Sequence, residues 1–86
     1  MLPAGYTNAV AVTPSDTAPV ISREGVAHPF AAVFCGTVTA GQTVTVITVG
    51  GQTVTFTNPV QGAAIYIRGT HVKATGTTAT NLVALW

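Results

Sequence analysis

The chain has 86 residues, of which 48% are hydrophobic and only 6% are charged. An ordinary soluble domain has about 25% charged residues, so this chain lacks the charged surface that keeps a free monomer in solution. A chain of this length forms one domain with a modest core, and such domains often depend on disulfides, metals or oligomerisation. One cysteine excludes an intrachain disulfide, and two histidines without a second cysteine do not provide the usual zinc ligands. We therefore expect oligomerisation, with no metal and no cofactor.

The first third of the chain differs from the rest in its proline content. Four of the five prolines precede residue 30, and proline discourages both helices and central strands. The segment 13–17, with the sequence Thr-Pro-Ser-Asp-Thr, is typical of a turn. The segment is too apolar and too poor in charge for a disordered tail. We predict an extended N-terminal arm over residues 1–29, with short extended pieces at 8–12 and 19–22, and a β-domain over residues 30–86.

From Phe30 onward the sequence predicts strands and no helix. Apolar or alternating runs separated by glycine, proline and asparagine predict strands at 30–35, 43–49, 52–57, 63–68, 70–75 and 81–86. Gly69 interrupts the strand that begins at 63–68 and continues at 70–75, and it is typical of a bulge. The predicted fold class is all-β, a small antiparallel β-sandwich or barrel.

A repeated pentapeptide predicts the hairpin within this domain. Gly-Gln-Thr-Val-Thr occurs at 41–45 and again at 51–55, and Gly50-Gly51 lies between the two alternating runs. A two-residue turn would place Ile47 opposite Val54, whereas a three-residue loop would place Val44 and Val46 on the face of Val54 and Phe56. In both registers the two faces are partly apolar, which predicts that the second face of the sheet meets another surface.

Residues with reactive side chains offer no catalytic site. Cys35 follows an apolar strand without a basic neighbour, and free cysteines of this kind are usually buried. His28 and His71 have no carboxylate close in sequence, and no Gly-x-Ser-x-Gly motif occurs. The sequence predicts no enzyme.

Nucleic-acid and membrane binding are also not expected. Arg23, Arg68 and Lys73 are the only cationic residues besides the histidines, which is too weak a footprint for a phosphate backbone. The longest apolar run, 30–35, is far shorter than the roughly 20 residues that span a bilayer. Residues 1–5 do not resemble the start of a signal peptide.

Eight residues are candidate assembly contacts. We expect the turn and arm residues to contact a neighbouring chain. We expect the basic and aromatic residues to do so because arginine, tyrosine and tryptophan are favoured at interfaces. The set is Val12, Pro14, Asp16, Val20, Arg23, Tyr66, Arg68 and Trp86. Trp86 is equally suited to two roles, closing the end of the core and anchoring an interface.

Three ordered segments resemble a known family. The sequence 50–58 (GGQTVTFTN), the sequence 72–80 (VKATGTTAT) and the terminal 82–86 (LVALW) are similar to the capsid spike-base family of tailed bacteriophages, prophages and gene transfer agents. The arm segment 12–17 (VTPSDT) resembles that family too.

This resemblance implies a small β-structured virion protein on the capsid exterior, made in the host cytoplasm. It would form a homo-oligomer, a pentamer or a trimer, at the capsid vertices. Its partners would be the major capsid protein and a head spike or fibre protein, and it would have no catalytic activity.

Two alternatives remain open from the sequence. A capsid decoration (cement) protein would have the same composition. A carbohydrate- or receptor-binding module would need aromatic platforms, for which Tyr6, Tyr66 and Trp86 are the candidates with a polar group.

Overall fold

The computed structural model describes residues 6–86, except for the side chain of Arg23, and this part of the chain contains nine strands and no helix. The strands are β1 (Ala9–Ala11), β2 (Ser22–Arg23), β3 (Val26–Ala27), β4 (Ala32–Thr37), β5 (Thr43–Thr48), β6 (Thr53–Thr57), β7 (Ala64–Ile65), β8 (Gly69–Val72) and β9 (Thr80–Leu85). The predicted all-β class is confirmed.

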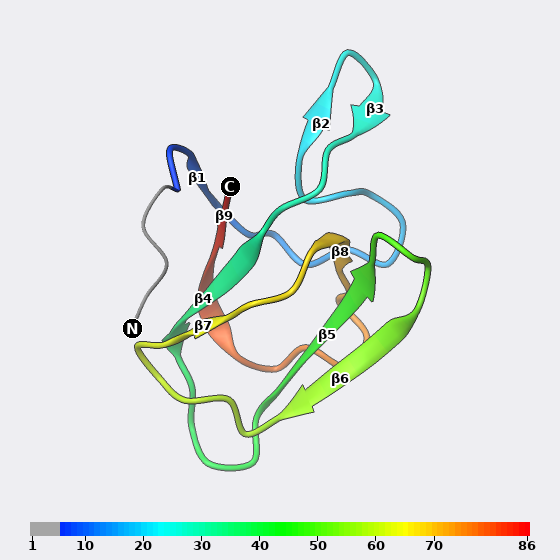
Figure 1. Cartoon of the computed structure of the whole chain (residues 1–86). Helices are drawn as coiled ribbons and strands as arrows, with labels where there is room; N and C mark the ends of the chain where they lie inside the picture. The colour runs from blue at the N-terminus through cyan, green and yellow to red at the C-terminus, as the bar shows by residue number, and fades with distance from the viewer. Residues whose placement is uncertain (1–5) are drawn as a thin grey trace.

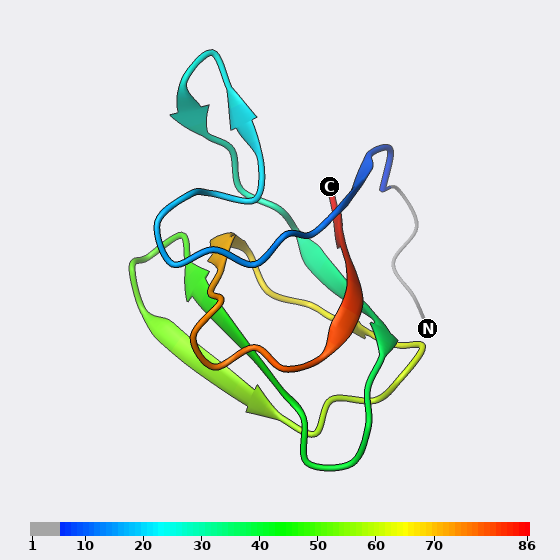
Figure 2. The ribbon, with the colours of Figure 1, turned by 180° about the vertical axis from the view of Figure 1, so that it is seen from behind.

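Two antiparallel sheets form the body of the protein (Figures 1 and 2). The first, sheet A, has the strand order β1-β9-β4-β7, and the second, sheet C, has the order β6-β5-β8. Strands β2 and β3 form a separate hairpin that projects from the body. The arrangement is a sandwich in which the inner faces of the two sheets enclose the core.

The chain crosses between the two sheets at β7 and β8. Strand β7 pairs with β4 in sheet A, and a few residues later β8 pairs with β5 in sheet C. Phe30 and Gly69 join the sheets by two backbone hydrogen bonds of 2.8 and 3.2 Å. A Cβ at Gly69 would lie 2.8 Å from both the Ile47 carbonyl oxygen and the Phe30 ring, so only glycine fits here. The register of β8 shifts beside Gly69, as expected for a bulge, but the prediction that one strand continues through Gly69 is wrong, because β7 and β8 pair in different sheets.

The β5–β6 hairpin has the longer of the two predicted loops. Thr48 N donates to the Gln52 carbonyl oxygen, so residues 49–51 form a three-residue loop in which Gly51 has a φ of +89°. Val46 therefore faces Val54, and Val44 faces Phe56. The two-residue turn, which would have set Ile47 opposite Val54, is wrong because the glycine in the left-handed region adds one residue to the loop.

Side chains from both sheets build the core. Phe30, Val33, Cys35, Val44, Val46 and Val72 are fully buried, and Leu82 and Ala84 add the contribution of β9. Val33, Cys35, Leu82 and Ala84 alternate with residues that face away from this core, as expected for a pleated sheet.

Residues 6–21 of the predicted arm lie against the β-domain in the same chain, whereas its β2–β3 hairpin projects from that domain. Strand β1 is the edge strand of sheet A. Beyond it, Ser15 N donates to the Val72 carbonyl oxygen and Val20 N donates to the Thr70 carbonyl oxygen, each at 2.9 Å. The segment 15–20 thus runs along the outer edge of β8 and covers it. Residues 1–5 of the predicted arm lie outside the described residues.

Threonine side chains attach the β8–β9 connection to the outer face of sheet C. The Thr45 hydroxyl group contacts the Thr55 hydroxyl group and donates to the Gly76 carbonyl oxygen, both at 2.9 Å. Thr43 Oγ1 donates to the same carbonyl oxygen at 2.6 Å, and Thr45 N donates to Thr77 Oγ1 at 3.0 Å. Thr45 is the one buried polar residue of the described chain at 3% exposure, and these bonds satisfy it.

Replacing Gly76 by alanine tests this attachment. Gly76 has a φ of +92°, and an added Cβ would collide with the Thr45 hydroxyl group. Gly41→Ala is the matched control, because Gly41 has a φ of +84° but open space around it. We expect Gly41→Ala to lower the free energy of unfolding by about 1–2 kcal/mol. Gly76→Ala should cost at least ~1 kcal/mol more, through the collision and the lost hydrogen bonds. Equal urea midpoints for the two variants would contradict this account.

Candidate assembly surface

The outer face of sheet A is built almost entirely from apolar side chains. Residues directly opposite each other on paired strands share a face, and β4 pairs Phe34 with Val83 and with Ala64. Applied to all four strands, this register gives an outward set of Ala9, Ala11, Ala32, Phe34, Ala64, Val83 and Leu85. Asn81, at the beginning of β9, is the polar residue of this face, and its side-chain amide donates to Thr37 Oγ1 at 2.8 Å. We call the seven apolar residues the sheet A patch.

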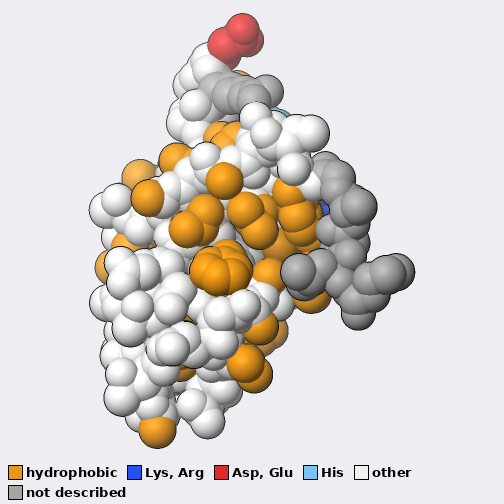
Figure 3. Space-filling view, turned by 90° about the vertical axis from the view of Figure 1, so that its left-hand side faces the viewer, with side chains coloured by type: hydrophobic (Ala, Val, Ile, Leu, Met, Phe, Trp, Pro, Cys, Tyr) orange, Lys and Arg blue, Asp and Glu red, His pale blue; other side chains and the backbone are white. Residues whose placement is uncertain are grey.

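The sheet A patch is partly exposed and carries no charge. Ala9 and Ala11 are exposed, Phe34, Ala64, Val83 and Leu85 are half-buried, and Ala32 is fully buried. No strand of sheet A contains a charged residue. Figure 3, viewed from the side of sheet A, shows hydrophobic side chains gathered over the middle of this face, with the acidic side chain far away at the tip. Continuous apolar patches on soluble proteins mark interaction sites.

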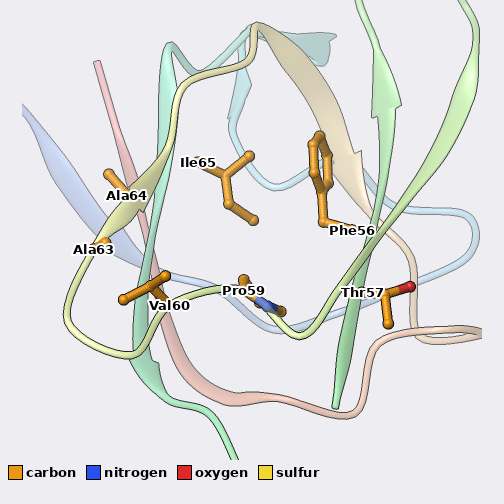
Figure 4. A pocket seen from close by; sticks show the side chains of 7 residues that line it. All are labelled: Phe56, Thr57, Pro59, Val60, Ala63, Ala64 and Ile65. Carbon is orange, nitrogen blue, oxygen red and sulfur yellow. The ribbon is translucent and has the colours of Figure 1, made fainter. Parts of the chain in front are cut away.

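A second apolar feature lies where the edges of the two sheets meet. Phe56 of β6 and Ile65 of β7 point toward each other across a cavity of about 220 Å³ (Figure 4). The connection from β6 to β7 completes its wall with Pro59, Val60 and Ala63. The cavity is apolar and small, so it suits an aliphatic side chain better than a cofactor.

Four of the candidate contact residues are used within the chain. Val12 and Pro14 line a cavity of about 310 Å³ beside the start of β9, and Val12 N donates to the Leu82 carbonyl oxygen at 2.9 Å. Val12 and Val20 are half-buried and pack against the core. Asp16 binds Thr75, as described next. These contacts place the segment 12–20 on its own domain.

Asp16 fixes the N-terminal segment to the β8–β9 connection. Its two carboxylate oxygens accept hydrogen bonds from the Thr75 backbone N–H at 2.9 Å and from the Thr75 hydroxyl group at 2.6 Å. The hydroxyl bond, followed by the backbone bond and the charge of Lys73, lowers the pKa of Asp16 below its ordinary value. The local pattern around Asp16 predicts a turn and gives no signal for a partner 59 residues away.

The remaining candidate residues lie apart from one another. Tyr66 is half exposed and lies in a tight turn after β7, in which Ile67 N donates to the Ile65 carbonyl oxygen. Arg68 is exposed before β8, and Arg23 contributes its backbone to the β2–β3 hairpin. Trp86 is half-buried and packs against the core. The structure does not gather the eight residues into one site.

Trp86 also forms an aromatic contact at the end of the sandwich. Its ring centroid is 6.0 Å from that of His28, with the planes tilted by 51°. Trp86 Nε1 and His28 Nδ1 are both buried, and neither has a hydrogen-bond partner within the described chain.

The predicted burial of Cys35 is borne out: the side chain is fully buried, and this burial raises the pKa of its thiol.

Sequence reasoning did not single out the residues of the sheet A patch. The signal was present in two apolar runs, 30–35 and 82–86, whose residues are hydrophobic at every position. Alternation identifies a strand with one buried face, whereas an unbroken apolar run indicates that both faces avoid water. These two runs are the neighbouring strands β4 and β9, so their outward residues form one patch.

Comparison with known proteins yields no relative: no family model matches the chain, and neither a curated protein nor a solved structure matches it.

Within residues 6–86 the structure has no helix that is long and apolar enough to cross a membrane. The same residues contain no cluster of three or more His, Cys, Asp or Glu side chains that could hold a metal ion.

Acidification tests the link between Asp16 and Thr75. Because the folded-state pKa of Asp16 is lowered, its contribution to stability is complete above the ordinary aspartate pKa of about 3.9 and is lost as pH falls through the lower folded-state value. We expect the urea midpoint of Asp16→Asn to fall less between pH 5 and pH 2 than that of the unmodified protein. Urea titrations of both proteins at about five pH values measure this difference. Glu24→Gln, which removes the other acidic side chain from an exposed turn, should keep the full pH dependence. Parallel pH curves for the unmodified protein and Asp16→Asn would exclude this role.

Proposed function

We propose that the protein is a non-enzymatic structural component of a phage virion. It would form an oligomeric base on the capsid exterior, at the vertices, and attach a head spike or fibre. The observation that carries this proposal is the sheet A patch, a whole sheet face without a charged side chain. The low charge of the chain and the resemblance of three segments to the capsid spike-base family support it.

The size of the sheet A patch explains why oligomerisation would matter. Strands of three, six, two and six residues, spaced ~4.8 Å apart with ~3.3 Å per residue, give a face of about 270 Å². Burial at ~25 cal/mol per Å² yields about 7 kcal/mol, which lies within the range of the cost of association, about 4–15 kcal/mol. One such contact is marginal, whereas several subunits in one assembly reinforce one another.

In this proposal the patch makes the subunit contacts. The major capsid protein and the spike or fibre bind the assembled oligomer. A cement protein spread over the shell would use the same apolar face. A particle reconstruction separates the two, because density at the vertices alone supports the base and density across the shell supports the cement protein.

Phe34→Asp tests the use of the patch. Phe34 lies between Val83 and Ala64, so a carboxylate there must be desolvated when the patch is covered. We expect binding to capsids of the encoding phage, measured by co-sedimentation, to fall at least tenfold, since burying a phenylalanine side chain is worth about 1.5–3 kcal/mol.

Thr39→Asp is the control, because it adds the same charge at an exposed position outside the four strands of sheet A. Unchanged capsid binding by a folded Phe34→Asp protein would refute the role of the patch. Deletion of residues 1–20 is a poorer test of capsid binding. It removes β1 from sheet A and Asp16 from Thr75, and so is expected to destabilise the fold itself.

A further inference from the structure

Strand β6 has an unpaired edge. It is the outermost strand of sheet C, and no strand lies beyond it in either ribbon view (Figures 1 and 2). Asn58 N donates to the Gln42 carbonyl oxygen and Thr48 N to that of Gln52, so the even-numbered residues of β6 bond to β5. The backbone N–H and C=O groups of Thr53, Thr55 and Thr57 therefore point away from the sheet.

Proteins usually prevent pairing at an edge strand with charged residues, proline or a bulge. Strand β6 contains no charged residue and no proline, and its register with β5 has no bulge. The opposite edge of sheet C is covered, because the segment 15–20 is hydrogen-bonded to β8. Within the described residues, sheet C is thus protected on one edge and open on the other.

We propose that β6 pairs with β6 of a second copy of this chain, antiparallel about a twofold axis at Thr55. In this register Thr55 faces Thr55 of the partner subunit, and Thr53 faces Thr57 of the partner subunit. It is the register that uses all three outward pairs of backbone groups. A twofold contact is formed by one surface on both copies, so a charged edge would meet its own charge, and this edge has none.

The cavity beside β6 fits the same register. Val54 and Phe56 face the interior of the sandwich, and their counterparts in the second copy continue that face. The partner subunit's Val54 then lies directly opposite Phe56, over the cavity lined by Phe56 and Ile65. Backbone pairing with a side-chain pocket beside it is the usual form of recognition by strand addition.

The pairing is small, so it should be weak and depend on concentration. Five residues span about 17 Å, and the contact falls below the ~1,600 Å² of a standard interface. It closes at two copies and does not involve the sheet A patch, so it would join two subunits of any larger assembly. It goes beyond the proposed virion function and does not rest on it.

Two double variants of the full chain test the pairing and its register. Thr53→Lys with Thr57→Lys places like charges opposite each other across the axis. Thr53→Lys with Thr57→Glu places each new lysine opposite a new glutamate. In sedimentation over about 10 μM to 1 mM, the mean mass of the first variant should fall below that of the unmodified protein as concentration rises, toward half of it at the highest concentrations. The second should match or exceed the unmodified protein at low salt.

A single cysteine gives an independent measurement. Hydrogen-bonded antiparallel residues have Cα atoms about 5.5 Å apart, within disulfide range. Thr55→Cys should therefore form a covalent dimer of twice the 8.7 kDa chain under mild oxidation, while the native Cys35 is buried and unreactive. Thr39→Cys, equally exposed but away from β6, should crosslink at least tenfold more slowly.

The proposal fails if the unmodified protein sediments as a monomer up to 1 mM. It fails also if the two double variants behave alike, or if Thr55→Cys and Thr39→Cys crosslink at the same rate. Capsid binding by Phe34→Asp is a separate readout, so either idea can fall without the other.

Discussion

The bonds that Thr45 makes on the outer face of sheet C hold the rest of the structure in place. Through the Gly76 carbonyl oxygen and Thr77, this side chain and its backbone fix the connection from β8 to β9. That connection presents Thr75 to Asp16, and Asp16 in turn holds the N-terminal segment over the edge of β8. A polar residue with 3% exposure is tolerated because each of its groups finds a partner. The outer face of sheet C is therefore partly occupied by the chain itself, whereas the outward positions of sheet A are apolar and partly exposed.

The two outer faces explain the unusual composition. A small domain with few charges needs another source of solubility, and threonine supplies it on sheet C, where hydroxyl groups bond to backbone and to each other. The outer face of sheet A lacks such hydroxyl groups, since alanine, valine, leucine and phenylalanine occupy its outward positions. The strands of both sheets lack charged residues, so the two outer faces differ in their hydroxyl groups and not in their charge. Phe34 and Thr45 are the two residues in which this difference is clearest.

Local pattern was enough to predict the all-β class, the β5–β6 hairpin and the bulge at Gly69, because alternation and glycine act over a few residues. The hairpin loop could not be chosen from sequence, since Gly50 and Gly51 permit both turns and packing decides between them. The destination of Asp16 was equally hidden, because a carboxylate that suits a turn also suits a distant threonine. The sheet A patch depends on β9 lying beside β4, a topological fact with no local signal.

The strand order of sheet A has a consequence for the timing of folding. Strand β9 lies between β1 and β4, so a central strand of this sheet is the last of the nine to be synthesised. Until it emerges, β1 has no partner and Phe34 has no neighbour at Val83. The apolar face can thus form only late, after long-range pairing that is intrinsically slow. A nascent chain on the ribosome would therefore not display the complete sheet A patch until β9 has emerged.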